Sequence, residues 1–376
     1  MARRGRREAR ASRRSSCYRT RTLLPALGNA RHPSAKLTRI AISIQQGEKN
    51  MNVTRRNFLA GTGIAATAVL AGCGSSNGSS DGASASGEKT YKIGVVQLTE
   101  HAALDASNEG FVEAVNASGL SVSIDQQNAQ NDQSACQTIA SKFVGDGVDL
   151  IFAIATPAAQ AAAGATAEIP IVGTAITDFA ASGLVQDNDK PGTNVTGSSD
   201  LTPVAEQLEM MQKVLPDVKK VGLLYCSAES NSDIQIKAAK DELDALGLEY
   251  TEYAVSSSNE IQSVVESAVG KVDALYAPTD NTIAAGAAQV GQICKENKLP
   301  FVTGEEGMCM AGGLFTLSIN YKDLGKVAGE MAVKILKGES KPADMAIEHL
   351  STSELVVVKN DEMAQAIGVD LSALDA

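Results

Sequence analysis

From Tyr91 onward, hydrophobic and polar positions follow two alternating patterns. Short β-branched runs such as YKIGVVQ, VDLIFAIAT and IPIVGTA are separated by longer segments with helix-forming composition, among them LDASNEGFVEAVNAS and QSACQTIASKFVGDG. Strands that alternate with helices of this length predict βαβ units, a parallel sheet and right-handed connections. Ligand sites of such sheets lie at the carboxyl ends of the strands.

The pattern is then repeated. Three segments recur in the same order at offsets of 128, 124 and 130 residues: KIGVVQ at Lys92 with KVGLLYC at Lys220, VDLIFAIAT at Val148 with VDALYAPTD at Val272, and IPIVGTAITD at Ile169 with LPFVTGEEG at Leu299. Generic βαβ repetition would not keep three offsets so close. We therefore expect an α/β fold of two similar, doubly wound parallel-sheet lobes.

The N-terminal part of the sequence resembles an export signal. MNVTRRNFLAGTGIAATAVLAGC combines a basic start, a short apolar stretch and the lipobox Leu70-Ala71-Gly72-Cys73, and its Arg55-Arg56 resembles a twin-arginine signal. The stretch is too short and too rich in Gly and Ala for a membrane-spanning helix. We expect residues 51–72 to be a lipoprotein signal, Cys73 to be lipidated, and residues 73–89 to be a flexible tether. Residues 1–50 are interpreted as upstream sequence translated in error.

The charge of the exported part excludes one class of partner. Residues 73–376 hold 18 Lys, no Arg and 42 Asp or Glu, a formal net charge of −24. Such a surface repels phosphate backbones, so nucleic acid is not an expected partner. Four cysteines follow Cys73 without metal-binding spacing, which leaves disulfides and free thiols both open. We expect no metal and no cofactor.

Eight segments carry a resemblance to a known family. They are QLTEHAALD (97–105), FAIATPAAQ (152–160), IVGTAITD (171–178), NVTGSSD (194–200), YCSAESNSDIQ (225–235), VSSSNEIQ (255–262), APTDNTIA (277–284) and GEEGM (304–308). Over residues 90–370 the chain resembles ABC transporter substrate-binding lipoproteins related to tryptophan- and aromatic-amino-acid-binding proteins, with a type I periplasmic-binding fold. The resemblance implies uptake of a small solute, and no catalysis.

The resemblance also implies a hinge. In two-lobed binders of this kind the chain crosses between the lobes three times, and closure traps the ligand. We place the crossings near Leu201, Asn320 and Ile347. The N-terminal lobe then comprises residues 90–200 plus 320–346, and the C-terminal lobe residues 201–319 plus 347–376. The implied partners are a small ligand, an ABC permease and, through the lipid, the outer face of the cytoplasmic membrane.

Polar residues at strand ends are the candidates for ligand contact. Helix starts hold anions without a basic side chain, so a ligand carboxylate is assigned to hydroxyls, amides and backbone N–H groups around Thr156, Ser227, Ser232, Thr279 and Asn281. An ammonium is assigned to Asp280 first, then Asp178 or Glu305, although Asp280 also suits a helix cap. Tyr225 and Tyr321 are candidate aromatic walls, Gln97 a polar contact, and His101 either a ligand contact or a cap.

Alternative functions remain open. The same fold serves sensory receptors, and the ligand is an aromatic or branched amino acid or, failing that, a sugar or nucleoside; the shortage of aromatic residues disfavours a sugar site built on aromatic platforms. A hydrolase is disfavoured because P-loop and GxGxxG motifs are missing from the sequence, and GxSxG occurs only within the predicted tether, as GSSNG (74–78) and GSSDG (78–82). Adjacent Glu305 and Glu306 would also point to opposite faces of an extended segment. We expect no enzymatic activity.

Overall fold

The structure is a computed structural model that describes residues 89–375. The predicted signal, Cys73 and nearly all of the predicted tether lie outside the described residues. Within the described part, no helix has the length and apolar character needed to cross a membrane.

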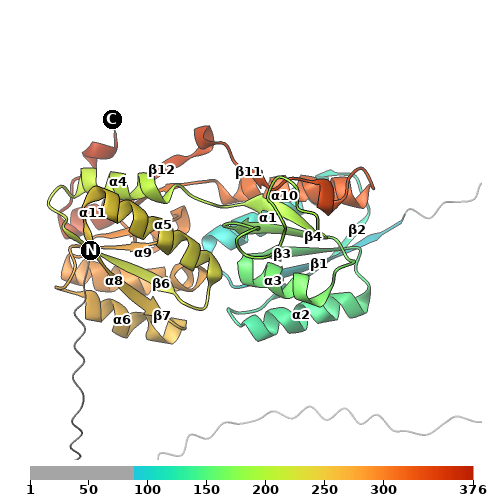
Figure 1. Ribbon diagram of the computed structural model, residues 1–376, viewed down its shortest axis with the longest axis horizontal. Helices are drawn as coiled ribbons and strands as arrows, with labels where there is room; N and C mark the ends of the chain where they lie inside the picture. Colours follow the sequence, from blue (N-terminus) through green and yellow to red (C-terminus); the bar gives the residue numbers. More distant parts are fainter. Residues whose placement is uncertain (1–88, 376) are drawn as a thin grey trace, which may run out of the picture. The chain divides into compact units, whose positions relative to one another are not determined.

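The first sheet has six strands, and every neighbouring pair is parallel. In sheet order they are β11 (Glu348–His349), β5 (Val195–Ser199), β4 (Ile171–Ile176), β3 (Leu150–Ile154), β1 (Tyr91–Gln97) and β2 (Val122–Asn128). Helices α1 (Ala102–Ala117) and α10 (Tyr321–Leu336) cover one face, and α2 (Gln133–Asp146) and α3 (Thr156–Ala165) cover the other (Figure 1). Helices on both faces make this a doubly wound sheet.

The second sheet repeats this plan with four parallel strands. Its order is β7 (Glu249–Val255), β6 (Lys220–Cys226), β8 (Ala274–Ala277) and β9 (Phe301–Thr303). Its helices are α4 (Val204–Val214), α5 (Ser230–Leu246), α6 (Ile261–Ala268), α7 (Asn281–Ala285), α8 (Ala287–Asn297), α9 (Glu306–Gly312) and α11 (Asp361–Ile367). Short 3₁₀ turns are η1 (Ser258–Glu260), η2 (Pro342–Asp344), η3 (Thr352–Glu354) and η4 (Ser372–Leu374).

The predicted repeat is confirmed by the matching strand orders. Strands β1, β3 and β4 of the first sheet correspond to β6, β8 and β9 of the second. In both sheets the next strand in sequence after the first, β2 or β7, lies at the sheet edge beside β1 or β6. Each pair comes from segments that echo each other in sequence. The connection from β1 to β2, or from β6 to β7, therefore leads toward one edge of the sheet, and the later connections lead toward the other edge. This reversal creates a topological switch point at the carboxyl ends of the strands.

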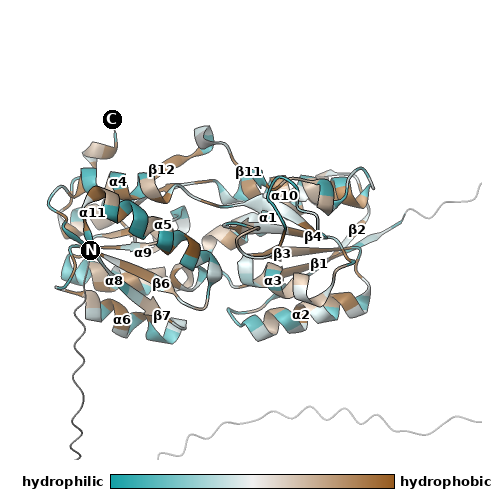
Figure 2. Cartoon of the chain, in the orientation of Figure 1, coloured by the Kyte–Doolittle hydropathy of each residue, from teal (hydrophilic) through white to brown (hydrophobic). Residues whose placement is uncertain are grey.

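Each sheet has its own hydrophobic core. One core gathers residues such as Val95, Phe111 and Phe152 around the first sheet, and the other gathers residues such as Leu223, Tyr276 and Phe301 around the second. Figure 2 shows the hydrophobic strands β1, β3 and β6 and the largely polar helix α5. We call the first sheet with its core the first lobe, and the second sheet with its core the second lobe. Cys136, Cys226, Cys294 and Cys309 are buried free thiols.

The chain passes between the two cores at three places. The first passage lies between β5 and α4, and the second between β10 (Phe315–Ser318) and α10. The third comes later than expected, because β11 still pairs with β5 and Leu355 still packs against the first core. The expected crossing near Ile347 is corrected to the start of β12 (Val356–Lys359), which pairs antiparallel with β10.

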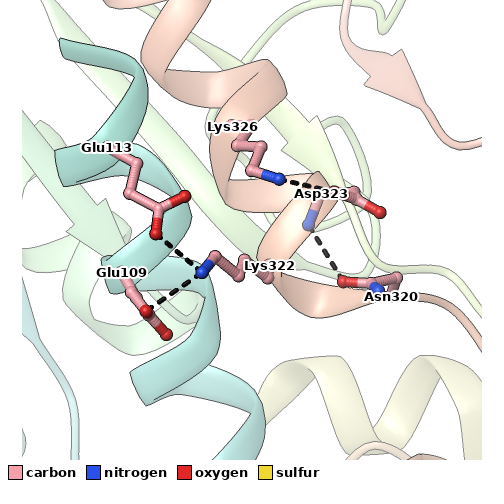
Figure 3. A network of polar contacts seen from close by, with 6 residues as sticks. All are labelled: Glu109, Glu113, Asn320, Lys322, Asp323 and Lys326. Carbon is pink, nitrogen blue, oxygen red and sulfur yellow. Dashed lines mark hydrogen bonds and ion pairs between the residues drawn. The ribbon is translucent and has the colours of Figure 1, made fainter. Parts of the chain in front are cut away.

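Helices α1 and α10 pack unusually closely. A Cβ atom on Gly325 would lie 1.9 Å from the carbonyl oxygen of Ser107, and one on Gly110 would lie 2.0 Å from that of Lys322. Lys322 also reaches Glu109 at 3.0 Å and Glu113 at 2.7 Å on α1 (Figure 3). Exposed ion pairs contribute little, so the glycine contacts fix α10, and with it Tyr321, against α1.

We predict that Gly325→Ala destabilises the protein by several kcal/mol, because the new methyl group meets a backbone oxygen that cannot move without separating the helices. Gly145→Ala is the matched control. Gly145 lies in exposed α2 with open space around its Cβ position, so this change should stabilise by roughly 0.5–1 kcal/mol. Urea unfolding measures both; equal effects would refute the packing argument.

Candidate functional site

A cavity lies between the two lobes. Residues from both lobes line it, and most of them are polar. The first lobe contributes strand-end and helix-start residues, and the second lobe supplies the opposite wall. The lining residues are His101, Leu104, Ala175, Thr177, Asp200, Asn231, Thr279, Asp280, Asn281, Ala284, Glu305 and Tyr321.

Five helix starts converge on this cavity. His101 precedes α1, Asn231 is the second residue of α5, Asp280 precedes α7, Glu305 precedes α9, and Tyr321 begins α10. This convergence follows from the fold, because helices that follow parallel strands start at the carboxyl edge of the sheet. Each start directs N–H groups and a partial positive charge toward the cavity.

Two of these helix starts are already occupied by acidic side chains. Asp280 caps α7 by accepting from the N–H of Ile283 at 2.8 Å, and Glu305 caps α9 by accepting from the N–H groups of Gly307 and Met308. The Glu229 carboxylate accepts a further pair of N–H groups at the start of α7, at 3.2 and 2.9 Å. By contrast, no side chain caps α1. The start of α5 also has no side-chain cap, so the starts of α1 and α5 are the two of these five that no side chain occupies.

Asp200 differs from these acids. It follows β5 at the first crossing and is only 5 % exposed. Its Oδ2 accepts a 3.0 Å hydrogen bond from the hydroxyl of Tyr321 at the second crossing, whereas its buried Oδ1 has no partner among the described residues. An unpartnered buried carboxylate oxygen is costly. A ligand donor would remove this cost.

The cavity favours positive charge because acids line it without a basic partner. Burial raises the pKa of Asp200 to about 6 and that of Glu305 to about 7. Burial and the nearby charge of Glu229 raise the pKa of Asp280 as well. His101 does not offset them, since burial lowers its pKa below the ordinary 6.5. A ligand that brings a cation would favour the ionised carboxyls.

These pKa shifts predict that the unliganded protein loses stability as the pH rises. A carboxyl whose folded pKa of about 6 exceeds its ordinary 3.8 stabilises the fold fully below pH 3.8 and loses that contribution as the pH passes 6. For Asp200 the full difference corresponds to roughly 3 kcal/mol. Melting temperatures from pH 4 to 7 should fall less steeply in Asp200→Asn than in the wild type. Parallel profiles would contradict the assignment.

Six of the sequence-predicted residues are brought together by the structure. Thr279, Asp280, Asn281, Glu305 and Tyr321 line the cavity, and Ser232 lies behind them, donating to Oδ2 of Asp280 at 2.7 Å. Ser232 is inside α5, whose N-cap is Glu229. Both oxygens of Asp280 accept hydrogen bonds within the protein. The capping alternative therefore fits Asp280 better than the ammonium role.

The other five predicted residues lie outside the cavity lining. Gln97 bonds to Asp105 within the first lobe, at 2.6 Å. Thr156 is the first residue of α3, and Asp178 holds a turn within the first lobe. Tyr225 donates to a glutamate of β7 at 2.7 Å, and exposed Ser227 bonds to a carbonyl oxygen at the end of that strand. The side chains of Gln97, Asp178, Tyr225 and Ser227 form hydrogen bonds within their own lobes instead.

Sequence reasoning missed four residues near the cavity: Thr177, Asp200, Glu229 and Asn231. All four lie in or beside the segments IVGTAITD, NVTGSSD and YCSAESNSDIQ. The available signal for Asp200 was an acid immediately after the strand VTGSS, the same rule that selected Asp280.

The two lobes meet through polar side chains. Asn131 donates to Thr282 at 2.9 Å, Gln235 to Thr177 at 3.1 Å, and Gln133 to a backbone carbonyl of the second lobe at 2.9 Å. Groups of this kind also form hydrogen bonds with water when the lobes separate. The interface is therefore suited to repeated opening and closing.

Comparison with known proteins places the chain in a family. Residues 92–373 match the family of ABC transporter substrate binding proteins. The chain belongs to this family. The tyrosine-binding protein of Clostridioides difficile is 39% identical over 321 residues, which cover 84% of this chain and 92% of that protein. The family is a substrate-binding class rather than an enzymatic one, and its members act outside the cytoplasm with ABC transporters.

Solved structures confirm the type I periplasmic-binding fold. An ABC domain from Streptococcus pneumoniae in complex with L-Trp is 39% identical, with a TM-score of 0.73, and covers 76% of this chain and 98% of its own. A ligand-free, open substrate-binding protein from Clostridium difficile is 44% identical but has a TM-score of 0.58, covering 74% and 95%. The chain thus superposes better on a ligand-bound relative than on an open one of higher identity.

Proposed function

We propose that this protein captures an aromatic amino acid outside the cell and delivers it to an ABC permease. The relatives with bound or named ligands support an aromatic amino acid, since one is a tyrosine-binding protein and another was crystallised with L-Trp. The observation that carries the proposal is the buried, unpartnered Oδ1 of Asp200 in the cavity between the lobes.

The ligand's two charged groups have separate positions in this proposal. The ammonium binds Asp200, with Glu305 as the second acid in the cavity. The carboxylate binds the uncapped start of α1, where backbone N–H groups and the helix dipole replace the arginine that the exported part does not contain. The ring lies against Leu104, Ala175, Ala284 and Tyr321.

The position of Asp200 couples ligand binding to closure of the two lobes. Asp200 and Tyr321 lie at two of the three crossings and are hydrogen-bonded to each other. An ammonium bound to Asp200 therefore acts at the hinge as well as in the cavity. Because the ligand contacts both lobes only when they are together, it favours the closed form by its differential affinity. The permease would then recognise the closed form, and no reaction is catalysed.

We predict that Asp200→Asn weakens binding of L-Tyr and L-Trp by at least tenfold, since a charge-assisted hydrogen bond contributes roughly 1.5–3 kcal/mol. Isothermal titration calorimetry of the purified residues 89–376 measures the change. Asp241→Asn, the same chemical change at an exposed position of α5, should leave the affinity unaltered. Wild-type affinity in Asp200→Asn would refute the ammonium assignment.

We also propose that the chain is lipid-anchored through Cys73 to the outer face of the cytoplasmic membrane, after removal of residues 51–72. The lipobox supports this proposal, as does the extracytoplasmic location of the family. Stable anchoring requires more than one acyl chain, as bacterial lipoproteins provide.

Cys73→Ser should move the protein from the membrane fraction to the soluble fraction, because the thiol that carries the lipid is lost. Fractionation followed by intact-mass measurement tests this expectation. Ser80→Ala, in the predicted tether that follows Cys73, is the control and should not alter the distribution. Retention of Cys73→Ser in the membrane would contradict the lipid anchor.

A further inference from the structure

His101 occupies a distinctive place beside the cavity. It precedes α1 with an extended backbone, and its Nε2 lies 3.2 Å from Oδ1 of Asn281 in the second lobe. Its Nδ1 is buried and has no hydrogen-bond partner in the described part of the chain. His101 therefore connects the two lobes with one ring nitrogen and leaves the other for a further partner.

The neighbours of His101 determine which nitrogen carries the proton. Asn281 Nδ2 donates to the Glu229 carboxylate at 2.6 Å, and a carboxylate can only accept there. This bond turns Oδ1 of Asn281 toward His101, and an amide oxygen also can only accept. Nε2 must then carry the hydrogen, so Nδ1 of a neutral ring is an acceptor.

Two other residues that line the cavity also have a buried hydrogen-bond acceptor without a partner. Asp200 has its unpartnered Oδ1, and Asn231 has an unpartnered Oδ1 because its Nδ2 faces the carbonyl oxygen of Thr279 at 3.2 Å. Among the residues that line the cavity, His101, Asp200 and Asn231 are those with a buried polar side-chain atom lacking a partner. All three of these atoms are acceptors.

We infer that His101, Asn231 and Asp200 together recognise a primary ammonium, with Nδ1 of His101 accepting one of its hydrogen bonds. A primary ammonium has three N–H donors, which matches three acceptors, and a carboxylate or an ether has none. The inference rests on the proposed function and extends it: the site selects the substitution state of the amine as well as its charge. His101 is then a ligand-contacting residue that functions in its neutral form.

The first test is a series of ligands titrated by calorimetry against wild-type residues 89–376. The series is L-Tyr, N-methyl-L-Tyr and N,N-dimethyl-L-Tyr, which have three, two and one N–H donors and the same positive charge. Each methyl group should weaken binding by about tenfold or more, since it leaves one buried acceptor unpaired. Equal affinity for L-Tyr and its N-methyl derivative would overturn the inference while leaving aromatic amino acid binding intact.

The second test uses His101→Phe, which keeps a ring and removes the acceptor. It should weaken L-Tyr binding at least tenfold and reduce the discrimination against N-methyl-L-Tyr. His349→Phe, at the exposed histidine of β11, is the matched control and should change neither value. Melting temperatures of both variants show whether the fold is kept. If His101→Phe is folded and still discriminates like the wild type, His101 has no role in recognition.

The third test needs no ligand. Nitrogen-15 NMR of histidine-labelled protein reports which imidazole nitrogen is protonated, and His349→Phe assigns the signals. For His101 we expect an unprotonated Nδ1 and a protonated Nε2. A proton on Nδ1 would refute the acceptor role. If L-Tyr and L-Trp do not bind at all but this tautomer is found, the proposed ligand is wrong and the acceptor arrangement stands.

Discussion

The constraint on which this structure depends is the burial of acidic side chains without basic partners. Asp200, Asp280, Glu229 and Glu305 are all buried at the meeting of the lobes, where His101 is the one nitrogen base that lines the cavity. Helix starts and hydroxyls satisfy three of these acids, which become part of the scaffold. Asp200 keeps one oxygen unpaired. That difference separates a structural acid from a binding acid, because an unpaired buried carboxylate is stabilised by an arriving cation.

The fold was largely predictable because its signals are periodic and local. The strands that echo each other, such as those beginning at Lys92 and Lys220, form corresponding strands of the two sheets. The third crossing was placed too early, since the two-residue strand β11 is too short to produce a hydrophobic pattern. Its pairing with β5 is a long-range contact. No local feature of that segment indicates which sheet it joins.

The site was predictable to the level of the strand ends but not of the side chains. The rule that polar residues follow parallel strands selected Thr279, Asp280, Asn281 and Glu305, and all four line the cavity. Their roles depend on partners distant in sequence, such as Glu229, which lies 52 residues from Asn281 and accepts from it. Burial and hydrogen bonding turned Asp280 into a cap and left Asp200 available. Sequence spacing contains no information about that division.

The account's central claim is that the ligand's amine completes the hydrogen bonding of Asp200. A crystal structure of residues 89–376 grown with L-Tyr tests it directly. The account predicts density for the amino acid between the lobes, with its nitrogen within hydrogen-bond distance of Oδ1 of Asp200 and its carboxylate at the start of α1. An amino acid bound with its nitrogen away from Asp200, or with its carboxylate facing that residue, would contradict the account.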